Sequence, residues 1–133
     1  MSGKKPFILG YVMLFSVSYF SLLTIIGNMC LALGWHPASS LNTIILIITV
    51  SIVAFWFVRK HGRPFSVSEY WQVLLGSILF DLAIQIGITV ALLGSAALSG
   101  KWVSIAFVLL CHAILLAVGY SSRVVRRYVR AST

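Results

Sequence analysis

Residues 74–98 read LLGSILFDLAIQIGITVALLGSAAL, an apolar run of membrane-spanning length that carries a single acid, Asp81. About 20 consecutive apolar residues, folded as an α-helix, cross the ~30 Å hydrocarbon core of a bilayer. A carboxyl group placed in that core costs roughly 2.5 to 3.5 kcal/mol on insertion scales. We therefore expect Asp81 to face protein or water instead of lipid.

This segment has two faces that are unsuited to lipid. At 100° per residue, Asp81, Gln85 and Thr89 fall on one ridge of a helix. A second ridge, roughly 160° away, consists of small residues that would let a neighbouring backbone come close. Its members are Ala83, Gly87, Ala91 and Ser95. A helix with two such faces is expected to lie between other helices, at the centre of a small bundle.

The composition is that of a membrane protein. The 133 residues are 60% hydrophobic and only 9% charged, whereas about 25% of the residues in a soluble domain are charged. The net charge of +8 could favour nucleic acid, but the basic residues stand at the ends of apolar runs. No basic stripe with interleaved stacking aromatics lies outside those runs, so we expect no nucleic-acid binding.

Four apolar runs predict an all-α integral membrane fold, a four-helix transmembrane bundle in one membrane domain covering residues 1–133. The expected helices are about 7–33, 40–58, 67–98 and 102–122, followed by a basic juxtamembrane tail at 123–133. The connections are short, which forces consecutive helices to run antiparallel. The second run is rich in Ile and Val, but its length matches a spanning helix.

The start of the third helix is marked by Ser66 and Glu69. A Ser followed three residues later by Glu forms a capping box, in which the two residues satisfy each other's backbone N–H groups. The helix should therefore begin at about Val67. Glu69 is one of only two acids in the chain, and a capping role is favoured over a catalytic or transport role.

The basic residues predict the orientation. Nine of the ten Lys and Arg residues fall on one side of the four-span arrangement, and only Lys101 falls on the other. The nine are Lys4, Lys5, Arg59, Lys60, Arg63, Arg123, Arg126, Arg127 and Arg130. By the positive-inside rule, both termini and the central loop are expected to be cytoplasmic.

The tryptophans give an independent check on the number of spans. Trp35 and Trp102 fall at the expected outer boundary, whereas Trp56 and Trp71 fall at the inner one, where amphipathic rings concentrate. The alternative is a first run that is cleaved after Ala32-Leu33-Gly34 as a signal peptide, which would leave three spans. A signal peptide's apolar core is shorter, about 7 to 15 residues, so a retained helix is favoured.

The tail is expected to contact lipid headgroups. Arg123, Arg126, Arg127 and Arg130 follow the i, i+3, i+4, i+7 spacing and fall on one side if the helix continues. Such a side should lie along an anionic membrane surface, with each arginine contributing on the order of 1 kcal/mol.

The chemistry of the chain is expected to centre on Asp81 and His112. Each lies about ten residues from the basic side of its helix, which places both at a depth of about 15 Å. A carboxyl and an imidazole at equal depth can form a hydrogen-bonded pair, a proton relay or half of a cation site. The alternative is that Asp81, Gln85 and His112 fix helix register, where such bonds average about 0.6 kcal/mol.

The sequence shows none of the common enzyme motifs. The sequence offers no Ser-His-Asp set at one membrane face, no metal-ligand spacing of Cys and His, and no phosphate-binding loop after a strand. Haem ligation between helices would need a second deep ligand besides His112. We therefore expect no enzyme, no catalytic residues, no metal and no cofactor.

Residues 57–77, FVRKHGRPFSVSEYWQVLLGS, resemble a family of small four-helix inner-membrane proteins of Gram-negative bacteria. Members share a basic loop with Gly-Arg-Pro and a Glu that opens the third helix. The resemblance implies a location in the bacterial inner membrane and a four-helix build.

Two functions follow as expectations. The size and helix count are similar to those of small multidrug transporters, but these carry a membrane-embedded Glu in their first helix, and here the deep acid is Asp81 in the third. The build is also similar to that of immunity proteins that shield an inner membrane from a pore-forming or depolarising toxin.

The prediction is a non-enzymatic multi-pass inner-membrane protein that acts by binding, with immunity as the specific function. The alternative is a small proton-coupled exporter that uses Asp81. The expected partners are anionic lipid headgroups, a membrane-active protein toxin and a second copy of the chain on the small-residue ridge.

Overall fold

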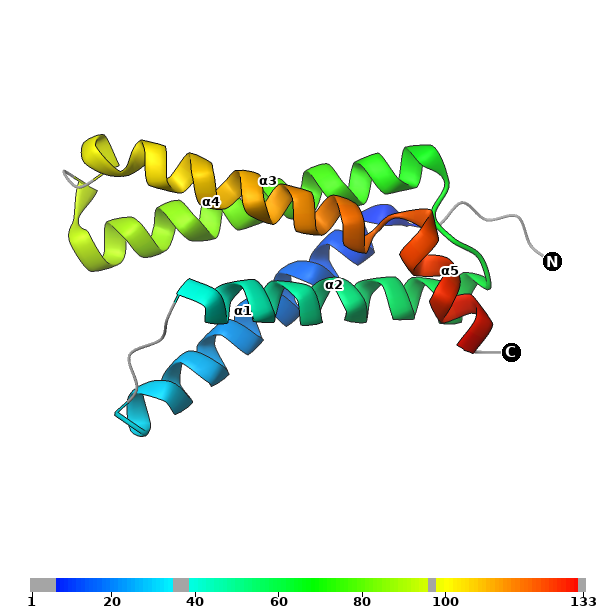
Figure 1. Ribbon diagram of the computed structural model, residues 1–133, viewed down its shortest axis with the longest axis horizontal. Coiled ribbons are helices and arrows are strands. Elements are labelled where there is room, and N and C mark those ends of the chain that lie inside the picture. The colour runs from blue at the N-terminus through cyan, green and yellow to red at the C-terminus, as the bar shows by residue number, and fades with distance from the viewer. Residues whose placement is uncertain (1–6, 35–38, 96–97, 132–133) are drawn as a thin grey trace.

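Five helices make up the part of the chain that the computed structural model describes, residues 7–34, 39–95 and 98–131. They are α1 (Ile8–Ala32), α2 (Ser39–His61), α3 (Val67–Leu93), α4 (Leu98–Gly119) and α5 (Ser122–Ala131), and these described ranges contain no strand (Figure 1). The first four each contain a segment long and apolar enough to cross a membrane. The expectation of four apolar spans is confirmed, and the chain is a multi-pass helical membrane protein.

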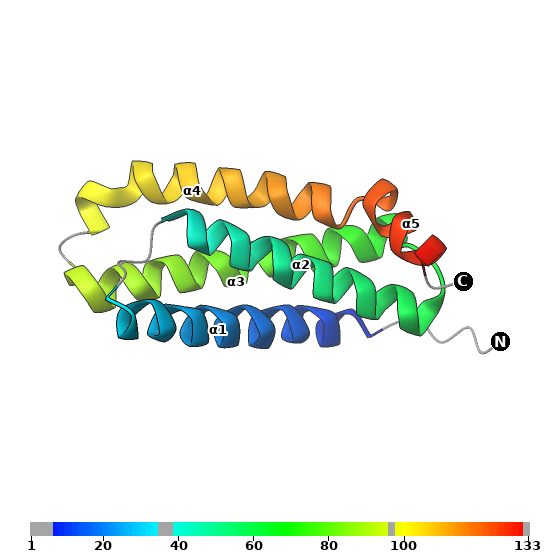
Figure 2. The ribbon, with the colours of Figure 1, turned by 60° about the horizontal axis from the view of Figure 1, so that its bottom comes forward.

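The four long helices pack as a square. α1 lies beside α2 and α3, and α4 lies beside the same two helices, so α1 and α4 occupy opposite corners (Figure 2). The start of α1, the segment joining α2 to α3, and α5 all lie at one end of the bundle (Figure 1). Arg59, Lys60 and Arg63 also lie at this end, which we call the basic end, whereas Lys101 lies in the first turn of α4 at the opposite end.

The core lies mainly in the half of the bundle nearest the basic end. α1 contributes Tyr11, Phe15 and Tyr19, which are spaced by four residues and share one ridge. Rings from other parts of the chain fill the space beside them: Phe57 of α2 packs against Phe65, which precedes α3, with 3.9 Å between ring centroids and 31° between the ring planes. Beyond Asp81, no α3 side chain that the structure describes is buried, and Figure 1 shows α1 and α3 diverging toward the far end.

The expectation that the third helix is the centre of the bundle is wrong. α2 is the most enclosed of the four long helices. In its apolar segment 44% of the residues are buried, compared with 22% in that of α3. The physical reason is the number of neighbours, because α2 packs against α1, α4 and α5 whereas α3 packs against α1 and α4 alone. The small-residue ridge is accordingly exposed at each of its members: Ala83, Gly87, Ala91 and Ser95.

Close helix contact is provided by two other glycines. A Cβ added to Gly76 of α3 would lie 2.7 Å from Cγ2 of Val12 on α1. A Cβ added to Gly119 of α4 would collide with Val50 of α2. A Cβ on Gly87, by contrast, would meet nothing within 4 Å. The glycines that permit packing therefore lie toward the basic end, outside the predicted ridge.

Several helix ends differ from the expected bounds. α3 ends at Leu93 instead of residue 98 because Gly94 adopts a positive φ of 79°, which interrupts the helix. α4 therefore begins earlier, at Leu98 instead of residue 102. α2 continues to His61 instead of residue 58. The predicted break at residues 35–38, including Trp35, lies outside the described residues.

The basic tail does not continue α4. α4 ends at Gly119, and the separate helix α5 turns aside from the direction of α4 and packs against α2 (Figure 1). Val125 is fully buried and Tyr128 packs against the core, which fixes the side of α5 that faces the bundle. The tail is thus part of the folded domain.

The capping box at the start of α3 is confirmed. The Ser66 hydroxyl accepts from the Glu69 backbone N–H at 3.4 Å, and the Glu69 carboxylate accepts from the Ser66 N–H at 2.8 Å. Glu69 also accepts two hydrogen bonds from the Arg63 guanidinium, at 2.7 and 2.8 Å. The hydrogen bonding to Glu69 raises the pKa of Arg63 above its ordinary value.

Candidate functional site

Asp81 and His112 meet inside the bundle. Asp81 on α3 is fully buried, and its Oδ2 lies 2.8 Å from Nδ1 of His112 on α4, which is itself only 2% exposed. α3 carries Asp81 one turn beyond buried Ser77, on the side that faces the core. The equal depth expected from residue counting is therefore accompanied by a direct side-chain contact.

The second carboxylate oxygen of Asp81 is approached from α1. The Tyr19 hydroxyl lies 3.1 Å from Asp81 Oδ1 and 2.6 Å from Oδ1 of Asn42, which belongs to the first turn of α2. Asn42, Tyr19, Asp81 and His112 thus form one polar chain, to which each of the four long helices contributes one residue. A contact of this kind ties the four helices together through polar atoms.

Gln85 lies at the edge of this chain. Its Nε2 is 3.5 Å from His112 Nδ1, at the long end of hydrogen-bonding distance. Thr89, which shares the predicted ridge, donates instead to the backbone carbonyl of Gln85. Of the predicted polar cluster, Asp81 and His112 form the short contact and Gln85 flanks it.

Tyr19 and Asn42 were not singled out from the sequence. A neutral tyrosine within an apolar run is read as packing, and an asparagine close to a helix start is read as part of the loop. The available signal was the spacing of Tyr11, Phe15 and Tyr19, which puts three aromatic residues on one ridge. A hydroxyl at the deep end of such a ridge needs a polar partner.

Other buried polar groups are paired separately from this chain. The Tyr120 and Ser77 hydroxyls lie 3.2 Å apart, and the Tyr11 hydroxyl lies 2.9 Å from Nε2 of His61. Across the described residues, every buried side-chain nitrogen or oxygen has a partner. The same residues include no group of three His, Cys, Asp or Glu side chains that could hold a metal ion.

The tail arginines lie on the outer side of α5. Arg123, Arg126 and Arg127 are exposed, and Val125 between them points into the core. The side chain of Arg130 lies outside the described residues. The side expected to meet anionic headgroups is therefore presented away from the bundle, and the contact with lipid stays a prediction.

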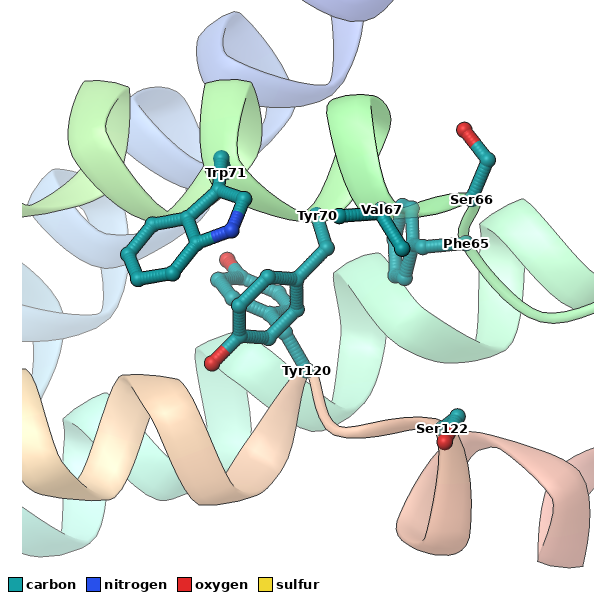
Figure 3. A pocket seen from close by; sticks show the side chains of 7 residues that line it. All are labelled: Phe65, Ser66, Val67, Tyr70, Trp71, Tyr120 and Ser122. Atoms are coloured by element: carbon teal, nitrogen blue, oxygen red, sulfur yellow. The ribbon is translucent and has the colours of Figure 1, made fainter.

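A cavity of about 300 Å³ opens at the basic end, where α3 begins and α4 gives way to α5. Figure 3 shows the Tyr70 and Trp71 rings between α3 and α4, with Ser122 at the start of α5. The Tyr70 hydroxyl donates to the backbone carbonyl of Ala117, so its hydrogen already takes part in a hydrogen bond within the protein. Among the described residues, the lining consists of aromatic side chains, Val67 and two serines, and such aromatic rings are typical of a membrane boundary.

The pair of Asp81 and His112 can hold a proton in more than one place. A charged carboxylate accepts from an imidazole N–H, and a protonated carboxyl can share its hydrogen with a neighbouring oxygen. The pair is enclosed by apolar side chains, where an unpaired charge would be costly. The arrangement is chemically suited to taking up and releasing a proton inside the membrane.

The comparisons with known proteins give no match: no protein-family model, no curated protein and no solved structure is similar to this chain. The resemblance of residues 57–77 to small inner-membrane proteins of Gram-negative bacteria stays a prediction.

Proposed function

We propose that the protein is a small, non-enzymatic, proton-coupled exporter in which Asp81 and His112 form the proton site. The observation that carries the proposal is the 2.8 Å contact between these two side chains in the buried middle of the bundle. Ionisable residues inside membrane spans are rare and mark proton or ion pathways by default.

A purely structural role explains the pair less well. Hydrogen bonds that fix helix register can be made by neutral side chains such as Asn, Gln or Ser, without the cost of burying a group that ionises. Here the central residue is one of only two acids in the chain. A titratable imidazole stands directly against it, which provides a donor and an acceptor within one contact.

The proposal includes a location and an orientation. We place the protein in the bacterial inner membrane with both termini in the cytoplasm, so that the basic end faces the cytoplasm. The exposed arginines of α5, and Arg59, Lys60 and Arg63 at and just after the end of α2, support this side, because positive charge accumulates on the cytoplasmic side. Arg123, Arg126 and Arg127 would then lie at anionic headgroups.

The test compares the two acids of the chain. Cells that overexpress the wild type are challenged with a panel of toxic amphipathic compounds, and purified protein in liposomes is assayed for proton movement with an internal pH dye. Asp81→Asn should abolish both the resistance and the compound-driven proton movement. Glu69→Gln, which removes the same charge at the membrane edge and keeps a capping side chain, should retain both.

Equal membrane levels of the three proteins are established by immunoblot. If Asp81→Asn protects cells and moves protons as well as the wild type does, the exporter proposal fails.

A second candidate is an immunity protein that binds a membrane-active toxin. The observation that favours it is the exposed ridge of Ala83, Gly87 and Ala91 on α3, to which a transmembrane segment of a toxin could pack closely. This role needs no proton site. The immunity function would be supported by a neighbouring gene that encodes a secreted toxin.

The two candidates respond oppositely to the same pair of variants. In cells exposed to the toxin, an immunity function predicts that Gly87→Leu loses protection because the added side chain blocks close packing, whereas Asp81→Asn keeps it. Leu79→Phe, an exposed change on the same helix, serves as the control. Protection that survives Gly87→Leu would contradict binding through this ridge.

A further inference from the structure

The Tyr19 hydroxyl has one hydrogen and two acceptors within reach. Asn42 Oδ1 lies 2.6 Å away on one side and Asp81 Oδ1 lies 3.1 Å away on the other. A phenolic hydroxyl donates a single hydrogen bond, so Tyr19 donates to one of these oxygens at a time. Which of them receives the hydrogen depends on the protonation of Asp81.

Two complete hydrogen-bonding arrangements follow. When Asp81 is a carboxylate, it carries only acceptors, and the stronger bond is the one from Tyr19 to the charged oxygen. When Asp81 carries a proton on Oδ1, that proton is donated to the Tyr19 oxygen, and the tyrosine hydrogen is free for Asn42. In both arrangements the Nδ1–H of His112 donates to Asp81 Oδ2.

The Tyr19 oxygen lies within hydrogen-bonding distance of both acceptors, so its position allows either arrangement. The short contact runs from Tyr19 to Asn42, and the longer one runs to Asp81. With Asp81 protonated and His112 neutral, Asp81 donates to Tyr19, Tyr19 donates to Asn42, and His112 Nδ1–H donates to Asp81 Oδ2, so this chain of hydrogen bonds holds no buried charge. The titratable groups that face Asp81 are Tyr19 from α1 and His112 from α4, and α2 contributes only the neutral Asn42.

We propose that Tyr19 is a positioning residue that transmits the protonation of Asp81 to α2. Protonation transfers the tyrosine hydrogen bond to Asn42 and ties α1 to α2, and loss of the proton returns it to Asp81 and releases Asn42. The proposal rests on the proposed function for its purpose, because an exporter must change the contacts between its helices when the proton site is occupied.

The position of Asn42 suits this role. Asn42 is half-buried near the start of α2, on the side of the pair away from the basic end, where the described part of α3 has no buried side chain beyond Asp81. A change in the hydrogen bond between Tyr19 of α1 and Asn42 of α2 therefore acts in the part of the bundle where α3 contributes no described buried side chain. The half of the bundle nearest the basic end, which holds most of the core, can keep its helix contacts.

The test is an infrared titration of the full protein in lipid nanodiscs, which follows the carbonyl stretch of a protonated carboxylic acid with pH. The band is assigned to Asp81 by its loss in Asp81→Asn and its retention in Glu69→Gln. Tyr19→Phe should move the titration midpoint to higher pH by about one unit, because the carboxylate loses its donor. Asn42→Leu should move the midpoint to lower pH, because the tyrosine hydrogen then has one acceptor.

The matched control is Tyr120→Phe, which removes an equally buried hydroxyl that is bonded to Ser77 instead. This variant should leave the midpoint unchanged. Shifts in opposite directions for Tyr19→Phe and Asn42→Leu support the proposal, since a structural role would not predict opposite signs.

The proposal is overturned if both variants shift the midpoint in the same direction or leave it in place, or if Tyr120→Phe shifts it as far as Tyr19→Phe. It is also overturned if no carboxyl band appears at any pH at which the protein stays folded. The titration needs no transported compound, so it can be judged separately from export. If Asp81→Asn exports normally while Tyr19→Phe and Asn42→Leu still shift the midpoint in opposite directions, the exporter proposal is rejected and the role of Tyr19 is retained.

Discussion

The two acids of the chain show how position decides the role of a carboxylate. Glu69 stands at the edge of the bundle, where it closes a capping box with Ser66 and binds Arg63 through two hydrogen bonds. Asp81 stands in the buried middle, where, among the described residues, Tyr19 and His112 lie within hydrogen-bonding distance of its oxygens. The first group organises a helix end, and the second joins α3 to α1 and α4 through side-chain contacts.

The capping role of Glu69 leads to a prediction at this scale. Glu69→Ala should lower the free energy of unfolding by about 1 to 2 kcal/mol, because it removes the cap of the Ser66 N–H and a partly exposed ion pair. Glu69→Gln should cost less, since the amide can still accept from Ser66. Reversible unfolding in mixed micelles measures both values, and an equal cost for the two variants would contradict the capping account.

Among the elements, the two glycines of α3 differ in what surrounds them. Gly76 lies against Val12 of α1, whereas Gly87 belongs to the exposed ridge and has open space beside it. Both are helical, so both incur the conformational cost of glycine. Only the neighbouring helix distinguishes them.

Alanine at these two positions should have opposite effects. Gly87→Ala should raise the free energy of unfolding by up to about 1 kcal/mol through helix propensity. Gly76→Ala should lower it by about 1 to 3 kcal/mol, because the methyl group overpacks against Val12. The same unfolding assay compares them, and the packing of α1 against α3 is incorrect if Gly76→Ala is the more stable protein.

The sequence is informative about properties that run along a helix. Apolar length predicts the four spans, Ser66 and Glu69 mark the start of α3, and residue counting brings Asp81 and His112 to one depth. The order of helices around the bundle depends on packing between distant segments, which residue spacing does not encode. For that reason residue spacing alone identifies neither α2 as the most enclosed helix nor the partners of Tyr19.

The behaviour of the tail has the same cause. The arginine spacing of α5 is visible in the sequence, but its packing against α2 depends on Val125 filling a site made by other helices. Likewise, Gly76 and Gly119 look no different in sequence from the exposed Gly87. Small residues permit close contact, and the surrounding fold determines where that contact is made.

For the whole molecule, the two ends of α3 provide a test of orientation. Ser68 is exposed near the start of α3, and Ser95 is exposed just beyond its end. In a variant without Cys30 and Cys111, a membrane-impermeant thiol reagent should label Ser95→Cys in intact spheroplasts. It should label Ser68→Cys only after the membrane is permeabilised. The reverse pattern would place the basic end outside the cell and contradict the proposed orientation.

The account as a whole depends on Asp81 and His112 acting as one unit inside the bundle. A double-mutant cycle tests this most directly, with Asp81→Asn, His112→Leu and the combined variant unfolded reversibly in mixed micelles. The contact predicts that the two substitutions are not additive, with an interaction energy of at least about 1 kcal/mol. Additivity within about 0.3 to 0.5 kcal/mol would mean that the two side chains do not interact in the folded protein, and would contradict the account.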